Sequence, residues 1–165
     1  MSNILNRFST EEEVDLQADK YLTFLIEKQF YAFSIKDVIE IIEVQDITPV
    51  PEFPDYVKGI INLRGRIIPV LDVRLRFHKA EASYTERTCI IVVSIQGLDV
   101  GFIVDTVDEV IDIDKENISG PPMITSDRST KYVVGVGKVN GRIILLLDSN
   151  KMLNESEIES LSTIK

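Results

Sequence analysis

Apolar residues along this chain gather in short segments rich in β-branched and aromatic residues, separated by polar or glycine-containing turns. Residues 21–26 and 30–35 are two such segments on either side of the polar stretch Glu27–Gln29, a pattern that predicts a β-hairpin. Residues 38–44 form a third segment, dominated by isoleucine and valine. Short strands at regular spacing with turn residues between them favour a small barrel or a sandwich, so we predict an all-β fold.

The most informative feature of the pattern is an internal repeat. Residues 56–72 read YVKGIINLRGRIIPVLD and residues 132–148 read YVVGVGKVNGRIILLLD, aligned without a gap at an offset of 132 − 56 = 76. Most positions are identical or exchange one apolar residue for another. A repeat of this length indicates one supersecondary unit built twice. Where the copies agree, folding explains the residue, and where they differ a specific use becomes more plausible.

The repeat extends to the segments before it. Residues 89–95 and 100–104 flank a turn, and the following VDEVI at residues 107–111 matches VIEII at residues 38–42, at an offset of 107 − 38 = 69. The change of offset, 76 − 69 = 7 residues, places the extra length in the second of two proline-containing connectors. Prolines exclude both connectors from central strands.

These patterns predict one domain made of two pseudo-repeated five-stranded β-barrels. We assign residues 1–18 to a flexible acidic N-terminal arm, residues 19–82 to the first barrel and residues 83–148 to the second. Residues 149–165 are expected to form a short helix that packs on a barrel, because an asparagine and a glutamate are spaced as an N-cap and its N3 partner: Asn154 and Glu157.

Composition and charge exclude several classes of function. The chain has 165 residues, 44% of them hydrophobic, and a formal net charge of −9. An acidic chain is a poor ligand for nucleic acid or an anionic membrane surface. No apolar run approaches the roughly 20 residues that span a membrane. We therefore expect a soluble, cytoplasmic protein.

The sequence singles out no catalytic or metal site. The one cysteine, Cys89, cannot form an intramolecular disulfide and is expected to be a buried structural thiol, while His78 is expected to lie in a solvated loop. These two residues cannot supply the four ligands of a structural zinc site. Residues 135–138 lack phosphate-loop spacing, and residues 112–116 lack the later glycine and glutamate of a calcium loop. We expect no enzyme and no cofactor.

The two repeat copies differ at the tip of their hairpin. The second copy has Asn140-Gly141, which suits a type I′ turn because both central residues adopt positive φ. The first copy has Arg64-Gly65, although arginine adopts positive φ at greater cost. Either this turn has another geometry or the arginine merely aids solubility, or Arg64 is an exposed recognition residue. Neighbouring Asn62 is also polar in an otherwise apolar strand.

Residues 59–74, GIINLRGRIIPVLDVR, resemble the signature of the CheW family, the coupling proteins of bacterial chemotaxis. The segments at residues 21–24, 38–42, 101–105 and 132–148 follow in the family's order, so the resemblance covers nearly the whole chain. It implies two five-stranded β-barrels around a shared hydrophobic seam. Phe77-His78 departs from the Phe-Gly often found after the signature.

The resemblance also implies a function. It implies a non-enzymatic adaptor, without cofactor or metal, that links the cytoplasmic tips of chemoreceptors to the regulatory domain of a CheA-type histidine kinase. It assigns a receptor-facing surface to the positions of Val38, Glu40, Gly59, Asn62 and Arg64. Kinase contacts are expected on loops of the second barrel, without assignment to residues. Two alternatives stay open, a CheW-like scaffold for a different two-component kinase and an unrelated β-barrel ligand-binding module.

Overall fold

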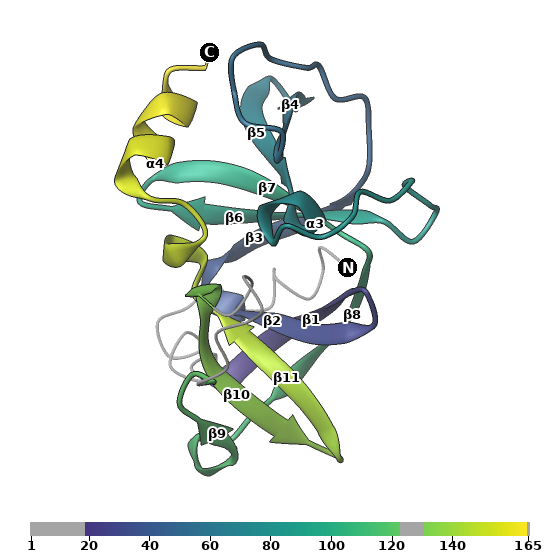
Figure 1. Ribbon diagram of the computed structural model, residues 1–165, viewed down its shortest axis with the longest axis vertical. Helices are drawn as coiled ribbons and strands as arrows, with labels where there is room; N and C mark the ends of the chain where they lie inside the picture. Colours follow the sequence, from purple (N-terminus) through teal and green to yellow (C-terminus); the bar gives the residue numbers. More distant parts are fainter. Residues whose placement is uncertain (1–18, 123–130, 165) are drawn as a thin grey trace.

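Two β-sheets make up most of the protein, one above the other in Figure 1. The computed structural model describes residues 19–122 and 131–164, so the arm expected at residues 1–18 lies outside the described residues. One sheet has six strands, in the order β8 (Thr106–Asp112), β1 (Lys20–Ile26), β2 (Gln29–Ser34), β11 (Arg142–Leu147), β10 (Val133–Val139) and β9 (Ile118–Ser119). The other has five, in the order β3 (Val38–Glu43), β6 (Cys89–Ile95), β7 (Leu98–Val104), β5 (Arg66–Asp72) and β4 (Val57–Leu63).

The helical elements are short. In the described part of the chain they comprise two α-helices, α3 (Val73–Arg76) and α4 (Glu155–Ser162), and 3₁₀ turns at Ile35–Asp37, Lys115–Asn117 and Ser149–Lys151. The expectation of a β fold with a C-terminal helix is thus confirmed as a mostly-β fold with two mixed sheets. Strand pairing within the described residues leaves both sheets open, with β8 and β9 as the edges of one and β3 and β4 as the edges of the other.

The internal repeat is visible in the topology. Strands β1, β2 and β3 correspond to β6, β7 and β8, while β4 and β5 correspond to β10 and β11. Under this correspondence the order β3-β6-β7-β5-β4 is the same as β8-β1-β2-β11-β10, and β9 is an addition to the second sheet. The irregularities agree as well, because the register shifts between Val57 and Gly59 in β4 and between Val133 and Gly135 in β10.

Each sheet, however, takes strands from both halves of the sequence. The hairpin β1–β2 lies in the sheet of β8, β10 and β11, and the hairpin β6–β7 lies in the sheet of β3, β4 and β5. Each sheet therefore combines strands from residues 19–82 with strands from residues 83–148. The reason is local: Ile35–Asp37 forms a 3₁₀ turn capped by the Ser34 side chain, and such a turn leads β3 away from β2 instead of reversing it as a hairpin.

The main hydrophobic core lies between the two sheets. It combines side chains of both, and the rings of Phe33 on β2 and Phe102 on β7 have centroids 5.7 Å apart. Two smaller clusters each contain residues from one sheet and its adjoining loops, represented by Ile61 and Val92 in one and by Ile144 and Ala32 in the other. Burial on both faces explains why strands such as β6 read as continuous apolar runs.

Helix α4 begins with the capping box predicted from the sequence. The Asn154 side chain accepts a hydrogen bond from the Glu157 N–H (2.8 Å), and the Glu157 carboxylate accepts one from the Asn154 N–H (2.8 Å). The carboxylate also accepts two hydrogen bonds from the Arg76 guanidinium (2.8 and 2.7 Å) and one from the Tyr56 hydroxyl. Leu161, one turn further along the helix, is buried in the core. One glutamate therefore both starts the helix and joins it to α3 and to the residue before β4.

The pKa of Glu157 reflects these hydrogen bonds and the burial of its carboxylate. Burial by itself would raise the pKa, but the hydrogen bonds from Arg76, the Asn154 N–H and Tyr56 outweigh it and lower the pKa below its ordinary value of 4.5. A lowered folded-state pKa means that ionised Glu157 stabilises the protein above the ordinary pKa. This stabilisation is lost as the pH falls through the folded-state value.

We expect Glu157→Gln to lower the free energy of unfolding by about 2 kcal/mol at neutral pH, because it removes charge-assisted hydrogen bonds. The deficit should shrink as the pH falls, since the wild-type carboxylate becomes protonated. Urea unfolding of both proteins between neutral and acidic pH measures it. Glu155→Gln, in the exposed first turn of the same helix, is the control and should cost under about 0.5 kcal/mol. A deficit that is the same at both ends of the pH range would contradict the assignment.

Candidate functional site

The β4–β5 hairpin carries the residue that most distinguishes the two repeat copies. Its turn has φ +53° at Arg64 and +87° at Gly65, and the β10–β11 turn has φ +51° at Asn140 and +77° at Gly141. Both turns thus place two residues in the left-handed region, as a type I′ hairpin requires. A different turn geometry does not explain Arg64. The first copy has an arginine at the turn position where the second copy has an asparagine, in the same conformation.

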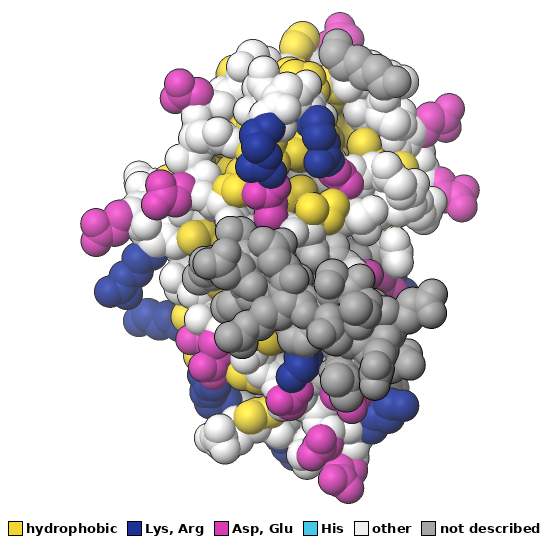
Figure 2. Space-filling model, turned by 180° about the vertical axis from the view of Figure 1, so that it is seen from behind, with side chains coloured by type: hydrophobic (Ala, Val, Ile, Leu, Met, Phe, Trp, Pro, Cys, Tyr) yellow, Lys and Arg dark blue, Asp and Glu magenta, His cyan; other side chains and the backbone are white. Residues whose placement is uncertain are grey.

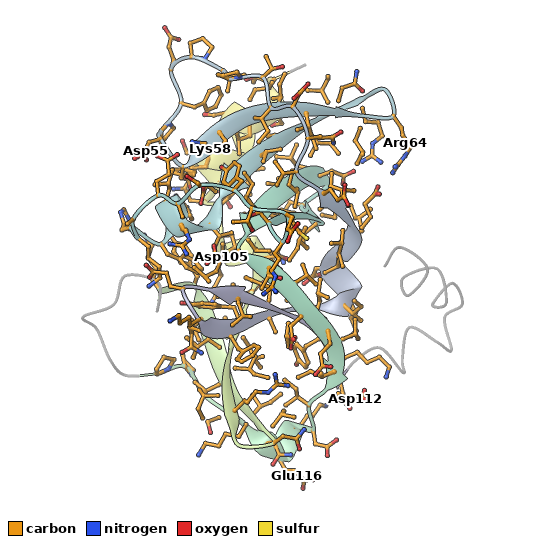
Figure 3. The ribbon with its side chains drawn as sticks, turned by 90° about the vertical axis from the view of Figure 1, so that its right-hand side faces the viewer. Asp55, Lys58, Arg64, Asp105, Asp112 and Glu116 are labelled. Atoms are coloured by element: carbon orange, nitrogen blue, oxygen red, sulfur yellow. The ribbon has the colours of Figure 1, made fainter. Side chains whose placement is uncertain are left out.

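Arg64 contacts Glu40 across the five-stranded sheet. An Nη2 atom of Arg64 donates to Glu40 Oε1, and the Arg64 side chain is 67% exposed while that of Glu40 is 15% exposed. Figure 3 shows Arg64 at the tip of its hairpin, directed outward. An ion pair this open to water contributes little stability, under about 1 kcal/mol. Its effect is to orient the guanidinium, most of which stays available to a partner.

Asn62 supports the same turn. Its side-chain Oδ1 accepts a hydrogen bond from the Gly65 N–H at 2.8 Å. The corresponding residue of the second copy is Lys138, which has no acceptor to offer such an N–H. The bond therefore accompanies the less favourable turn residue, and it offsets part of the cost of holding Arg64 at positive φ.

Gly59 lies further back on β4 and is buried. Its φ is +146°, and a Cβ added there would lie 2.1 Å from the Thr48 carbonyl oxygen. Thr48 and Ile60 exchange two backbone hydrogen bonds, both 2.9 Å long, which hold the proline-containing connector against β4. Only glycine permits this approach, so Gly59 acts on the shape of the site from below its surface.

Val38 is also buried. It begins β3, is 8% exposed and pairs with Val93 of β6, with a register shift before Glu40. Of the five residues predicted for the site, the structure brings Glu40, Asn62 and Arg64 together at the surface. Val38 and Gly59 are buried, and they shape β3 and β4, which carry the three surface residues. We call the surface made by Glu40, Asn62 and Arg64 the tip site.

Apolar side chains next to the tip site were not singled out by sequence reasoning. Ile39 is 37% exposed on β3, and Ile67, the cross-strand partner of Asn62, is 40% exposed on β5. Ile67 belongs to a continuous apolar run, so alternation did not mark it as outward-facing. Arg66 beside it contacts Asp99. The upper part of the face in Figure 2 shows the same kind of surface, with two basic side chains over acidic ones and apolar atoms around them.

Within the described ranges, no group of three or more His, Cys, Asp and Glu side chains is placed to hold a metal ion. His78 is exposed after α3, as expected, and Cys89 is half-buried with its Sγ 3.3 Å from the Arg87 carbonyl oxygen. Burial raises the pKa of the Cys89 thiol, which disfavours the reactive thiolate. None of the described helices is long and apolar enough to cross a membrane.

The fold and the tip site define a mostly-β protein that presents a polar, arginine-centred surface on strands of one sheet. A CheW-like domain model matches residues 20–157. Chemotaxis protein CheW of Klebsiella aerogenes is 32% identical over 145 residues, 88% of this chain and 87% of that protein. The CheW protein of Thermotoga maritima is 35% identical over 144 residues, 87% of this chain and 93% of that protein.

A solved structure agrees with these sequence matches. The crystal structure of a scaffolding CheW protein from Thermoanaerobacter tengcongensis aligns with a TM-score of 0.78 and 37% identity, covering 84% of this chain and 96% of that one. The chain belongs to the CheW family of chemotaxis proteins. The resemblance inferred from residues 59–74 and the segments around them is thereby confirmed.

We expect Gly59→Ala to destabilise the fold by about 3 kcal/mol, because it adds a Cβ at positive φ against the Thr48 carbonyl. Gly65→Ala is the matched control: its φ is +87° and nothing lies within 4 Å of the added Cβ. That change should cost about 1 kcal/mol, the penalty for a left-handed residue alone. Urea midpoints at unchanged m-value measure both. Equal losses would show that the connector does not press on Gly59.

Proposed function

We propose that this protein is a non-enzymatic adaptor that couples the cytoplasmic tips of chemoreceptors to a CheA-type histidine kinase. The observation that carries the proposal is Arg64, which is held at positive φ by Asn62, oriented by Glu40 and left largely exposed on a CheW-family fold. Arginine in such a setting offers a planar fork of donors to a partner surface. Folding alone favours the asparagine found at position 140 of the second copy.

The receptor surface of the proposal comprises Val38, Glu40, Gly59, Asn62 and Arg64. Glu40, Asn62 and Arg64 contact the receptor directly, and exposed Ile39 and Ile67 extend the contact with apolar area. Val38 and Gly59 act by shaping β3 and β4. Polar groups around an apolar patch are the usual anatomy of a protein interface.

The proposed mechanism needs no chemistry on the adaptor. The protein holds receptor and kinase together in membrane-anchored arrays on the cytoplasmic side. It shifts the kinase between conformations only by the difference between its affinities for them. Kinase contacts are placed on loops of the second predicted barrel, residues 83–148, without assignment to residues.

We further infer that each sheet closes as a small barrel. In the five-stranded sheet, Glu40 belongs to edge strand β3 and Arg64 to the hairpin of edge strand β4, so their ion pair spans the two edges. The cluster of Ile61, Val92 and their neighbours draws its side chains from this sheet and its connector. Curvature that brings two edges together also protects them from pairing with other chains.

Arg64→Ala should weaken binding to receptor cytoplasmic fragments on the order of tenfold, because a central interface arginine is lost. It should change the unfolding free energy by under about 0.5 kcal/mol. Calorimetry and urea unfolding measure the two effects. The exchange Glu40→Arg with Arg64→Glu is the control, because it keeps an ion pair but moves the guanidinium. If the exchanged pair bound receptor as well as wild type, Arg64 would act only by pairing with Glu40.

Adding this protein to a CheA-type kinase and receptor-bearing membranes should raise kinase autophosphorylation strongly, and only when both receptor and adaptor are present. Phosphate transfer from labelled ATP to the kinase measures it. The Arg64→Ala protein should give a reduced increase at the same concentration. No increase, with binding to neither partner, would contradict chemotaxis coupling and point to a different two-component kinase.

A further inference from the structure

A groove separates helix α4 from the connector that precedes β4. It encloses about 680 Å³ and is lined by residues of the connector, the start of β4 and one face of the helix. We call it the connector groove. It has no equivalent built by the second repeat copy in the described part of the chain, because α4 follows β11 whereas β5 leads through α3 directly toward β6. Folding explains the features that the two repeat copies share. A groove found beside only one copy therefore favours a specific use.

The connector groove has an apolar floor and an acidic rim. Tyr56 and Leu161 are buried in its floor, and Phe53 is half-buried beside them. Glu52 and Glu159 are exposed on opposite walls, one on the connector and one on α4. Its third glutamate, Glu157, is neutralised by Arg76, and no lysine or arginine is among the lining residues. Among the described residues, the lining of the groove therefore carries net negative charge above an apolar floor.

The backbone at the rim is strained. Glu52 has φ +68°, and unlike most other non-glycine residues of this chain with positive φ it does not lie in a two-residue hairpin turn. Glycine or asparagine would relieve the strain at this position. Residues held in such sparsely populated conformations cluster at active sites and ligand clamps.

We propose that the connector groove docks a segment of a partner protein that carries a large apolar side chain between lysine or arginine residues. The apolar side chain enters between Phe53 and Leu161, and the basic residues face Glu52 and Glu159. Charge disfavours the other occupants. A second copy brings a net charge of −9, and the chain's own residues 1–18 carry Glu11–Glu13 and Asp15 against one arginine.

The connector groove and the tip site lie at opposite ends of β4. The strand begins at Val57, which lines the groove, and ends at Leu63, next to Arg64. Figure 3 shows Asp55 and Lys58 on one side of the molecule and Arg64 on the other. Seven residues of strand span about 20 Å. A partner in the groove thus does not compete with a partner on Arg64.

A labelled peptide of alternating lysine and leucine is the probe, with alternating glutamate and leucine as its control. On isotope-labelled full-length protein, the basic peptide should shift the backbone amide signals of residues 51–57 and 156–163. The double variant Glu52→Lys with Glu159→Lys should weaken binding on the order of tenfold. The matched control, Asp114→Lys with Glu116→Lys, makes the same charge change at the far end of the molecule and should stay within about twofold.

Several outcomes would overturn the proposal. Equal weakening by both double variants would reduce the binding to non-specific attraction, and shifts outside the groove would place it elsewhere. Equal binding of the acidic peptide would show that Glu52 and Glu159 do not select a basic partner. Shifts of the groove amides with protein concentration alone would assign the groove to a second copy. Contacts between residues 4–8 and Phe53 in the free protein would assign it to the chain's own N-terminal segment.

Discussion

The parallel pairing of β2 with β11 and of β7 with β5 is the constraint on which this structure depends. Each pairing joins a hairpin of one half of the sequence to the last strand of the other half. Neither half can complete its sheet alone, so the two form one cooperative unit instead of two consecutive domains. The aromatic core between the sheets, including Phe33 against Phe102, forms only when both exchanges are in place.

Polar contacts reinforce the junction between the sheets. Asp105, between β7 and β8, accepts hydrogen bonds from Arg74 Nε (2.7 Å) and Nη2 (2.6 Å) and from the Glu27 N–H (2.9 Å) in the β1–β2 turn. Arg76 lies over Tyr56, 4.4 Å from the ring centroid, and is 5.3 Å from the ring centroid of its repeat counterpart. That counterpart is Tyr132. The two tyrosines are equivalent in the repeat, but the arginine near both rings belongs to the first half of the chain. Because this arginine also binds Glu157, α4 attaches to the first half.

A junction formed by backbone pairing between the two halves suits an adaptor. An adaptor couples two partners only if both bind to one connected structure. Here the tip site stands on β3 and β4 of one sheet, and the exchanged hairpins connect that sheet to its counterpart through backbone pairing. The exposed ion pair of the tip site contributes little to stability.

Much of this was accessible from the sequence, because the information was local. The repeat, the hairpin turns and the α4 capping box follow from residues a few positions apart, and the exception at Arg64 was visible against Asn140 of the second copy. The exchange of hairpins was not accessible, since both sheets have the same strand pattern and only long-range packing decides which hairpin joins which strands. Burial of Gly59 and Val38, exposure of Ile67 and the groove beside Glu52 depend on how connectors cross strands. The chain's local chemistry thus determined its elements and its unusual residues, and the tertiary structure decided which of those residues meet.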